Sequence, residues 1–307
     1  MACAGVYCCM RTVRLDGGKC LAKGGHAGVE VVMRRSVHWL GGALFVATVL
    51  VGLGREEATA KEASCDDPSN PDAIVGTSRA EVLRGTAGDD LILGLGGDDV
   101  IRGLGGVDVL CGGPGADTLV GGPGSDRLEG GSGSDVLREG QGAKGLLIGG
   151  SGGDQLLGGP GNDRMYGGRG DDDIKGGLGD DTVDYTQGRR PIRIDLREGT
   201  AAGEGDDLLS SVERAWGSVF DDVLIGTWRA EKLVGYDGAD VVSGRGGDDD
   251  LWGDQGDDAL DGGRGDDRLR GGGGDDALAG NDGADSLNGG PGVDDCSGGS
   301  TVTECEG

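Results

Sequence analysis

Residues 85–138 read, in blocks of nine, GTAGDDLIL, GLGGDDVIR, GLGGVDVLC, GGPGADTLV, GGPGSDRLE and GGSGSDVLR. The blocks share the rule G-G-x-G-x-D-x-U-x, in which U is an apolar residue. A fixed period of this kind is the sequence signature of a repeat architecture, in which each unit buries its apolar residues against its neighbours. The chain is therefore predicted to be a stack of nonapeptide units.

The same frame covers most of the chain. A first array spans 76–184, with a one-residue break at Glu139 and a degenerate unit, GQGAKGLLI, at 140–148. A second array runs from 217 to 297 without a break. Position eight is Leu, Ile, Val or Met in every unit except the last, where it is Cys296. Position six is Asp in eighteen units, and the exceptions are Glu81, Gly145 and Glu231.

Each repeated position has a physical role. Glycines at positions one, two and four permit positive φ and close backbone approach, which bends six residues into a turn with inward carbonyls. The x-U-x tail is a three-residue strand whose U side chain faces the core. Carbonyl and carboxylate oxygens are the ligands that Ca²⁺ selects, whereas zinc and copper favour His and Cys. The arrays contain no His, so calcium is the predicted metal.

We predict that the position-six carboxylates bind multiple Ca²⁺ ions. The predicted ligands are Asp90, Asp99, Asp108, Asp117, Asp126, Asp135, Asp154, Asp163, Asp172, Asp181, Asp222, Asp240, Asp249, Asp258, Asp267, Asp276, Asp285 and Asp294.

These nonapeptides resemble the diagnostic repeat of the RTX, or haemolysin-type calcium-binding, family over about residues 76–184 and 217–297. The resemblance implies an all-β fold, a right-handed parallel β-roll in which two nonapeptides form one turn of a solenoid. It also implies that calcium lies between stacked turns, bridged by Asp carboxylates and turn carbonyls. The units counted in the sequence then correspond to about ten coils, in two arrays separated by a short β insert.

The insert at 185–216 and the array ends carry different patterns. Ile192, Ile194 and Leu196 alternate with polar residues, which predicts a strand, followed by a turn at Gly199 and a second apolar run. We interpret the insert as a β cap between two rolls, with a binding feature as the alternative. Units 76–84 and 226–234 share Arg-Ala-Glu at positions four to six and are predicted to be capping turns that bind calcium poorly. Residues 61–75 form an N-terminal cap segment, and 298–307 form a C-terminal tail.

Residues 1–60 are predicted to be an upstream extension and a signal peptide. Residues 36–54 carry no charged side chain, Arg34 and Arg35 precede them, and Ala58-Thr59-Ala60 provides a cleavage site after Ala60. Met33 is a candidate start. An uncleaved anchor is the alternative. Cleavage predicts a secreted protein without stable membrane insertion.

Four cysteines follow the predicted cleavage site: Cys65, Cys111, Cys296 and Cys305. An even number in an exported chain suggests two disulfides. Pairing 65 with 111 and 296 with 305 would staple both ends of the solenoid, although spacing alone leaves the connectivity open.

Charge and composition bound the function. The 307 residues include 72 Gly and 55 Asp and Glu against 28 Lys and Arg, with a net charge of −27. Such a chain repels nucleic acid and anionic membrane and attracts cations. Composition alone permits a disordered polymer, but the strict period favours an extracellular structural protein that folds on binding Ca²⁺.

The sequence leaves two alternatives to a calcium-binding structural protein. RTX arrays often accompany enzymes, but only 61–75 and the insert lie outside the repeats, and neither could house a catalytic domain, so no enzyme activity is predicted. An accessory part of a hydrolase or epimerase is the remaining enzymatic alternative. The other alternative is an adhesin or carbohydrate-binding module for cell-surface or matrix glycans. Its candidate stacking residues are Trp216, Trp228, Trp252, Tyr166 and Tyr236. A basic cluster, Arg189, Arg190, Arg193 and Arg197, could dock an acidic partner or pair with nearby carboxylates.

Overall fold

The computed structural model describes residues 13–16, 19–22, 65 and 68–305. The chain divides into two units, Met1–Glu57 and Ala58–Gly307. In the first unit, β1 (Val13–Asp16) pairs antiparallel with β2 (Lys19–Ala22), two strands that the sequence did not predict. The predicted signal peptide, its cleavage site and the start at Met33 lie outside the described residues. Within that described part, no helix is long and apolar enough to cross a membrane.

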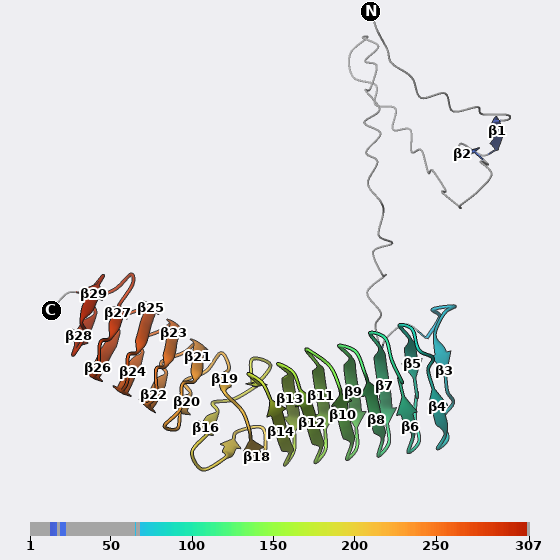
Figure 1. The fold of residues 1–307 in the computed structure, drawn as a ribbon, viewed down its shortest axis with the longest axis horizontal. Helices are drawn as coiled ribbons and strands as arrows, with labels where there is room; N and C mark the ends of the chain where they lie inside the picture. The colour runs from blue at the N-terminus through green and yellow to red at the C-terminus, as the bar shows by residue number, and fades with distance from the viewer. Residues whose placement is uncertain (1–12, 17–18, 23–64, 66–67, 306–307) are drawn as a thin grey trace, which may run out of the picture. The chain divides into compact units, whose positions relative to one another are not determined.

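The second unit consists of two β-sheets that face each other (Figure 1). Sheet I contains, in chain order, β4 (Val82–Arg84), β6 (Val100–Arg102), β8 (Thr118–Gly122), β10 (Val136–Gly140), β12 (Gln155–Pro160), β14 (Asp173–Leu178), β16 (Arg193–Asp195), β17 (Thr200–Ala202), β18 (Asp206–Ser210), β20 (Val223–Ile225), β22 (Val241–Gly246), β24 (Ala259–Arg264), β26 (Ala277–Asp282) and β28 (Asp295–Ser297). Sheet II contains β3 (Ile74–Val75), β5 (Leu91–Leu93), β7 (Val109–Pro114), β9 (Arg127–Ser132), β11 (Leu146–Ser151), β13 (Arg164–Arg169), β15 (Thr182–Asp184), β19 (Arg214–Trp216), β21 (Lys232–Asp237), β23 (Asp250–Gln255), β25 (Arg268–Gly273), β27 (Ser286–Asn288) and β29 (Thr301–Thr303).

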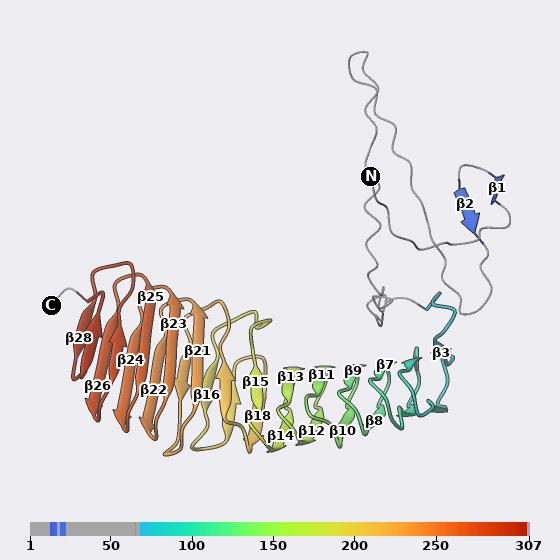
Figure 2. The same cartoon turned by 45° about the horizontal axis from the view of Figure 1, so that its top comes forward.

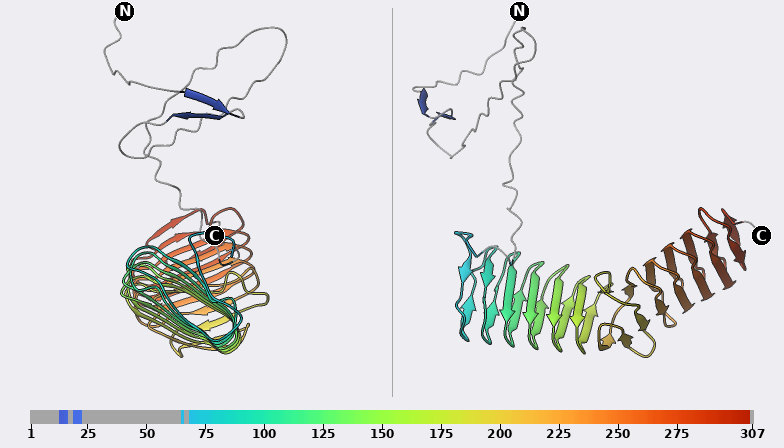
Figure 3. Two further views of the ribbon diagram at one scale, coloured as in Figure 1. Left: turned by 90° about the vertical axis from the view of Figure 1, so that its right-hand side faces the viewer. Right: turned by 180° about the vertical axis from the view of Figure 1, so that it is seen from behind.

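Successive repeats alternate between the two sheets, so each strand pairs in parallel with the strand two repeats away. Leu119 of β8 is in register with Leu137 of β10, eighteen residues later. The next pair, Leu137 with Leu156 of β12, is nineteen residues apart because of the extra residue in the degenerate unit. The prediction of a parallel β-roll with two nonapeptides per turn is therefore confirmed. Figure 3 shows the coils one behind another when the stack is seen end-on.

The core is a column of position-eight side chains between the sheets. Leu110, Leu128 and Leu147 of sheet II and Leu119 and Leu137 of sheet I are completely buried within a single apolar cluster. Successive side chains on a strand point to opposite faces, so residues seven and nine of each unit face outward. Because side chains alternate along each three-residue strand, every nine-residue repeat places one apolar side chain in the core.

The insert adds β16, β17 and β18 to sheet I and β19 to sheet II. β16 and β17 pair antiparallel, as do β17 and β18, while β18 pairs in parallel with β14 and β16 with β20. Figure 2 shows β16 and β18 between the strands of the two arrays. In sheet II, β15 pairs directly with β19. The predicted turn at Gly199 is present, with a φ of 67°. Hydrogen bonding therefore continues through the insert, and the two arrays form one stack.

The stack is longer than the repeat count suggested. Sheet II has thirteen strands among the described residues, against the ten or so coils expected. The additional rungs are formed by segments without the nonapeptide motif, namely β3, β19 and β29. β3 and β29 lie at the two edges of sheet II, whereas β19 lies between β15 and β21 and pairs in parallel with both.

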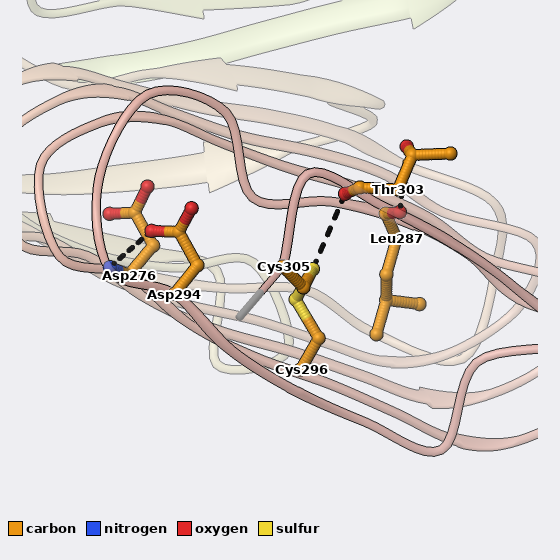
Figure 4. Close-up of a disulfide and its surroundings, with 6 residues drawn as sticks. All are labelled: Asp276, Leu287, Asp294, Cys296, Thr303 and Cys305. Carbon is orange, nitrogen blue, oxygen red and sulfur yellow. Dashed lines mark hydrogen bonds between the residues drawn. A yellow bond between two sulfur atoms is a disulfide. The ribbon is translucent and has the colours of Figure 1, made fainter. Parts of the chain in front are cut away.

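Cysteine pairs lie near both ends of the array. Cys65 and Cys111 form a disulfide with a Cα–Cα distance of 5.7 Å, and Cys296 and Cys305 form a second with 5.9 Å (Figure 4). Cys65 and Ala73 cover the outward-facing Leu91 and Leu93 of β5, which makes a small second apolar cluster. Cys65 and Ala73 thus pack on the outer face of sheet II.

Candidate metal centre

The position-six carboxylates form two ladders along the stack. Ladder I holds the acids that precede strands of sheet I, and ladder II holds those that precede strands of sheet II. In most rungs, one carboxylate oxygen accepts a hydrogen bond from the backbone N–H of the position-six residue one turn earlier. Asp99 N donates to Asp117 Oδ1 at 2.7 Å, and Asp276 N donates to Asp294 Oδ1 at 2.9 Å (Figure 4). These bonds give the carboxylates that accept them a common orientation.

The second carboxylate oxygen is buried without a hydrogen-bond partner in most rungs. These Oδ2 atoms belong to Asp99, Asp108, Asp117, Asp126, Asp135, Asp154, Asp163, Asp172, Asp181, Asp240, Asp249, Asp258, Asp267, Asp276 and Asp285. Native proteins rarely leave such atoms unpaired, because their lost hydration is not replaced. Two rows of buried carboxylate oxygens thus lack a partner, which a bound cation could supply.

Main-chain carbonyl oxygens face the same spaces. A β-carbon on Gly94 would lie 2.5 Å from Asp99 Oδ2 and 2.5 Å from the carbonyl oxygen of Gly112, one turn further on. A β-carbon on Gly124 would overlap the carbonyl oxygen of Gly106 and lie 2.9 Å from Asp126 Oδ1. Carboxylate and carbonyl oxygens together are the donor set of calcium, so the residues present fit that ion.

The three glycine positions serve different purposes. Positions two and four lie in the left-handed region, as at Gly113 (φ 102°) and Gly115 (φ 152°). Position two also accepts other residues there, such as Leu95 with a φ of 73°. Position one, as at Gly94, is not in this region. The prediction of positive φ for the whole glycine pair is thus wrong for position one, where the missing side chain instead leaves room for oxygens.

Within residues 13–16, 19–22, 65 and 68–305, no three Asp, Glu, Cys or His side chains lie together in a group that could hold a metal ion.

Burial changes the proton affinity of the ladder acids. Desolvation, reinforced by neighbouring carboxylates, raises the pKa of Asp117 and Asp135 to about 6. The same causes raise the pKa of Asp240 and Asp258 to about 7. The backbone N–H of the preceding rung opposes the rise in each case. The calcium-free ladders therefore hold protons far more readily than unfolded aspartates do.

Acid is expected to replace calcium in part. Because the folded pKa values of Asp117 and Asp240 lie above the ordinary aspartate value of 3.8, the folded chain binds protons that the unfolded chain does not. The calcium-free fold thus gains stability as pH falls through these folded pKa values. Circular dichroism in calcium-free buffer should show more β-structure at about pH 5 than at about pH 8. An equal or smaller β signal at the lower pH would contradict this prediction.

In four units the protein itself satisfies the acid. A Thr or Ser at position two donates its backbone N–H to the position-six carboxylate: Thr86 to Asp90 at 2.6 Å and Ser218 to Asp222 at 2.5 Å. Thr77 and Thr227 make the same bond to Glu81 and Glu231. These are the first two units of each array. The same bond is thus present in the predicted capping turns 76–84 and 226–234 and at Asp90 and Asp222, two of the predicted calcium ligands.

Neighbouring rungs of ladder II allow a matched comparison. Asp108→Asn removes charge beside a partnerless oxygen and is expected to lower calcium affinity at least about tenfold. Asp90→Asn makes the same change where Thr86 already occupies the oxygen, and it should leave the affinity within about twofold of wild type. Calcium titration by calorimetry measures both. Equal losses in the two variants would contradict the distinction between satisfied and partnerless acids.

Two acids that we did not predict continue the ladders through the insert. Asp172 N donates to Asp207 Oδ1, and Asp181 N donates to Glu213 Oε2, both at 3.0 Å. The other oxygen of Asp207 accepts the Tyr185 hydroxyl at 2.6 Å in a buried bond. Residues 203–210, GEGDDLLS, fit positions two to nine of the motif, so this signal was available for Asp207. Glu213 has no such signal, because the unit around it is shortened.

Most of the candidate glycan-binding aromatic residues contact Lys or Arg side chains. Lys232 Nζ lies 4.0 Å and the Arg270 guanidinium carbon 4.3 Å from the centre of the Trp252 ring. Arg164 lies 4.5 Å from the Trp216 ring. Tyr166 contacts Arg164, Tyr236 packs edge-on against Trp216, and Trp228 is exposed beside Arg229. These contacts give no support to a sugar-stacking face.

The predicted basic cluster pairs locally. Arg193 and Arg197 each lie 3.6 Å from Asp195, and Arg197 also contacts Glu198. The backbone N–H of Arg189 donates to Glu204. Arg190 is exposed. These contacts favour the local-pairing interpretation over an acidic partner.

The family model for the RTX calcium-binding nonapeptide repeat (4 copies) matches more than half of the chain. The matched residues are 75–110, 112–143, 148–183, 225–260, 234–269, 252–287 and 261–300. The chain belongs to the RTX calcium-binding repeat family. It is accordingly a calcium-binding structural repeat protein, and its β-roll is a structural repeat fold rather than a known enzyme fold. A search of curated proteins finds no match to this RTX chain.

Proposed function

We propose that this RTX chain is an extracellular structural protein whose solenoid folds as several Ca²⁺ ions fill its turns. The observation that carries the proposal is the set of fifteen buried Oδ2 atoms without a hydrogen-bond partner. Burying unpaired charge is strongly unfavourable, and the net charge of −27 adds repulsion. Calcium removes both penalties, so binding and folding become one event.

Two features support the extracellular location. The uncharged stretch 36–54 with its A-x-A site has the pattern of a signal peptide. The two cysteine pairs lie at disulfide distance, and disulfides persist in oxidising compartments. Sites with the affinity of other extracellular calcium modules, roughly 10⁻⁴–10⁻³ M, would be filled at the calcium levels found outside cells. N-terminal sequencing of the exported protein should find Lys61 first, and a chain retained with residues 36–54 would contradict export by cleavage.

Equilibrium dialysis with radioactive calcium tests the binding itself. The purified chain should bind several ions cooperatively, with half-saturation at roughly 10⁻⁴–10⁻³ M. Magnesium at the same concentration should not replace calcium, because it dehydrates reluctantly and demands octahedral geometry. The proposal fails if the chain binds no calcium at concentrations about tenfold above this expected half-saturation. It also fails if magnesium binds as well as calcium.

A further inference from the structure

Glu139 occupies the place that glycine holds in the neighbouring turns. Gly140 is in register with Gly122, a position-two residue, so Glu139 aligns with the position-one Gly121. The positions of the carbonyl oxygens support this alignment. A β-carbon on Gly121 would lie 2.7 Å from the carbonyl oxygen of Glu139, and a β-carbon on Gly103 would lie 2.8 Å from the carbonyl oxygen of Gly121. The frame break is therefore a ten-residue unit, 139–148, that begins with an acid.

The same unit lacks the acid at position six. Gly145 stands there, and its N–H donates to Asp163 Oδ1 at 2.6 Å, as a position-six N–H does in other rungs. A β-carbon on Gly145 would overlap Cγ of Glu139 and lie 3.0 Å from Asp163 Oδ1. A side chain at 145 and the side chain of Glu139 thus exclude each other. The unit has exchanged its two positions, with the acid at the first and glycine at the sixth.

The Glu139 carboxylate reproduces the state of the ladder acids. The residue is completely buried, Oε2 accepts the N–H of Gly142 at 3.0 Å, and Oε1 has no hydrogen-bond partner. A β-carbon on Gly142 would overlap both Oε1 and the carbonyl oxygen of Gly124, so the partnerless oxygen lies beside a turn carbonyl. The carboxylates of Asp163 and Asp126 are near enough to disfavour its charge. A cation is as necessary here as in the other rungs.

We propose that Glu139 is a calcium ligand that replaces the missing aspartate at position 145 and keeps ladder II continuous from Asp108 to Asp181. The inference rests on the proposed calcium-coupled function. It gives the inserted residue a role: the extra length of the turn lets a carboxylate from position one reach the space normally filled from position six.

Glu139→Gln tests this role, because it preserves shape and removes charge. The variant should bind at least one calcium ion fewer per chain than wild type in equilibrium dialysis with calcium alone. Asp163→Asn, in the next rung, should give a similar loss. Glu129→Gln is the matched control, since Glu129 pairs with Arg127 on the outer face of β9, and it should bind as many ions as wild type.

A reciprocal exchange keeps the test decisive if Glu139→Gln folds poorly. Glu139→Gly should lose the same ion, and Glu139→Gly combined with Gly145→Asp should recover both the ion and the β-rich circular dichroism spectrum. Gly145→Asp alone should destabilise the calcium-loaded fold, because two side chains compete for one space. An unchanged ion count in Glu139→Gln, or no recovery in the double variant, overturns the role of Glu139. A wild-type chain that binds no calcium overturns the proposed function instead.

Discussion

Gly103→Ala is expected to destabilise the calcium-loaded solenoid by about 2–4 kcal/mol. A β-carbon at this position-one residue would overlap Asp108 Oδ2 and lie 2.8 Å from the carbonyl oxygen of Gly121. The methyl group would therefore fill the space in which the cation is proposed to bind and push apart the oxygens that would hold it. Urea unfolding followed by circular dichroism in saturating calcium measures the loss.

Gly105→Ala, two residues later in the same turn, is the control. A β-carbon there would have the Pro123 carbonyl oxygen at 3.6 Å, which is an ordinary contact. This variant should lie within about 1 kcal/mol of wild type. If both alanine variants lose equal stability, the loss does not come from the filled space beside Asp108, and the account of position one is wrong.

Asp135→Asn is expected to act in opposite directions with and without calcium. Asp135 Oδ1 accepts the N–H of Asp117 at 2.8 Å, and its Oδ2 is partnerless. With calcium present, removing this charge should raise the concentration for half-saturation at least about tenfold. Without calcium, it removes a buried charge whose pKa is raised to about 6 by burial, so the residual β-structure should increase.

The control for this prediction is Asp173→Asn on the outer face of β14. The Asp173 carboxylate pairs with Lys175 at 2.6 Å and does not belong to a ladder. Neither the calcium titration nor the calcium-free spectrum should change beyond the small effect of a surface ion pair. A shift of the same sign in both conditions for Asp135→Asn would show that its carboxylate acts only through general stability.

The sequence period predicted the ladders and the core because both depend on one repeated geometry. An Asp at position six always enters the turn, and a Leu at position eight, such as Leu137, always points between the sheets. Parallel pairing at a distance of two repeats follows from the same period. These features need no knowledge of the individual turn.

The exceptions depend on contacts that the motif does not encode. Asp90 differs from Asp108 only because Thr86 at position two reaches its second oxygen. In the sequence, Glu139 only interrupts the nine-residue period. Its alignment with Gly121 follows from the strand register, which spacing does not give. Asp207 lies in a repeat whose first residue is Ala202, inside a segment otherwise made of antiparallel strands. Which carboxylates are left partnerless is thus a property of the assembled stack.

The central claim is that calcium is part of the fold, and far-UV circular dichroism of the full chain with calcium or with EDTA tests it most directly. We predict a β-rich spectrum at millimolar calcium, the range of extracellular sites, and a largely disordered spectrum in EDTA that recovers when calcium is restored. Identical β-rich spectra in the two conditions would contradict the account, because the buried partnerless carboxylates would then be stable without a cation.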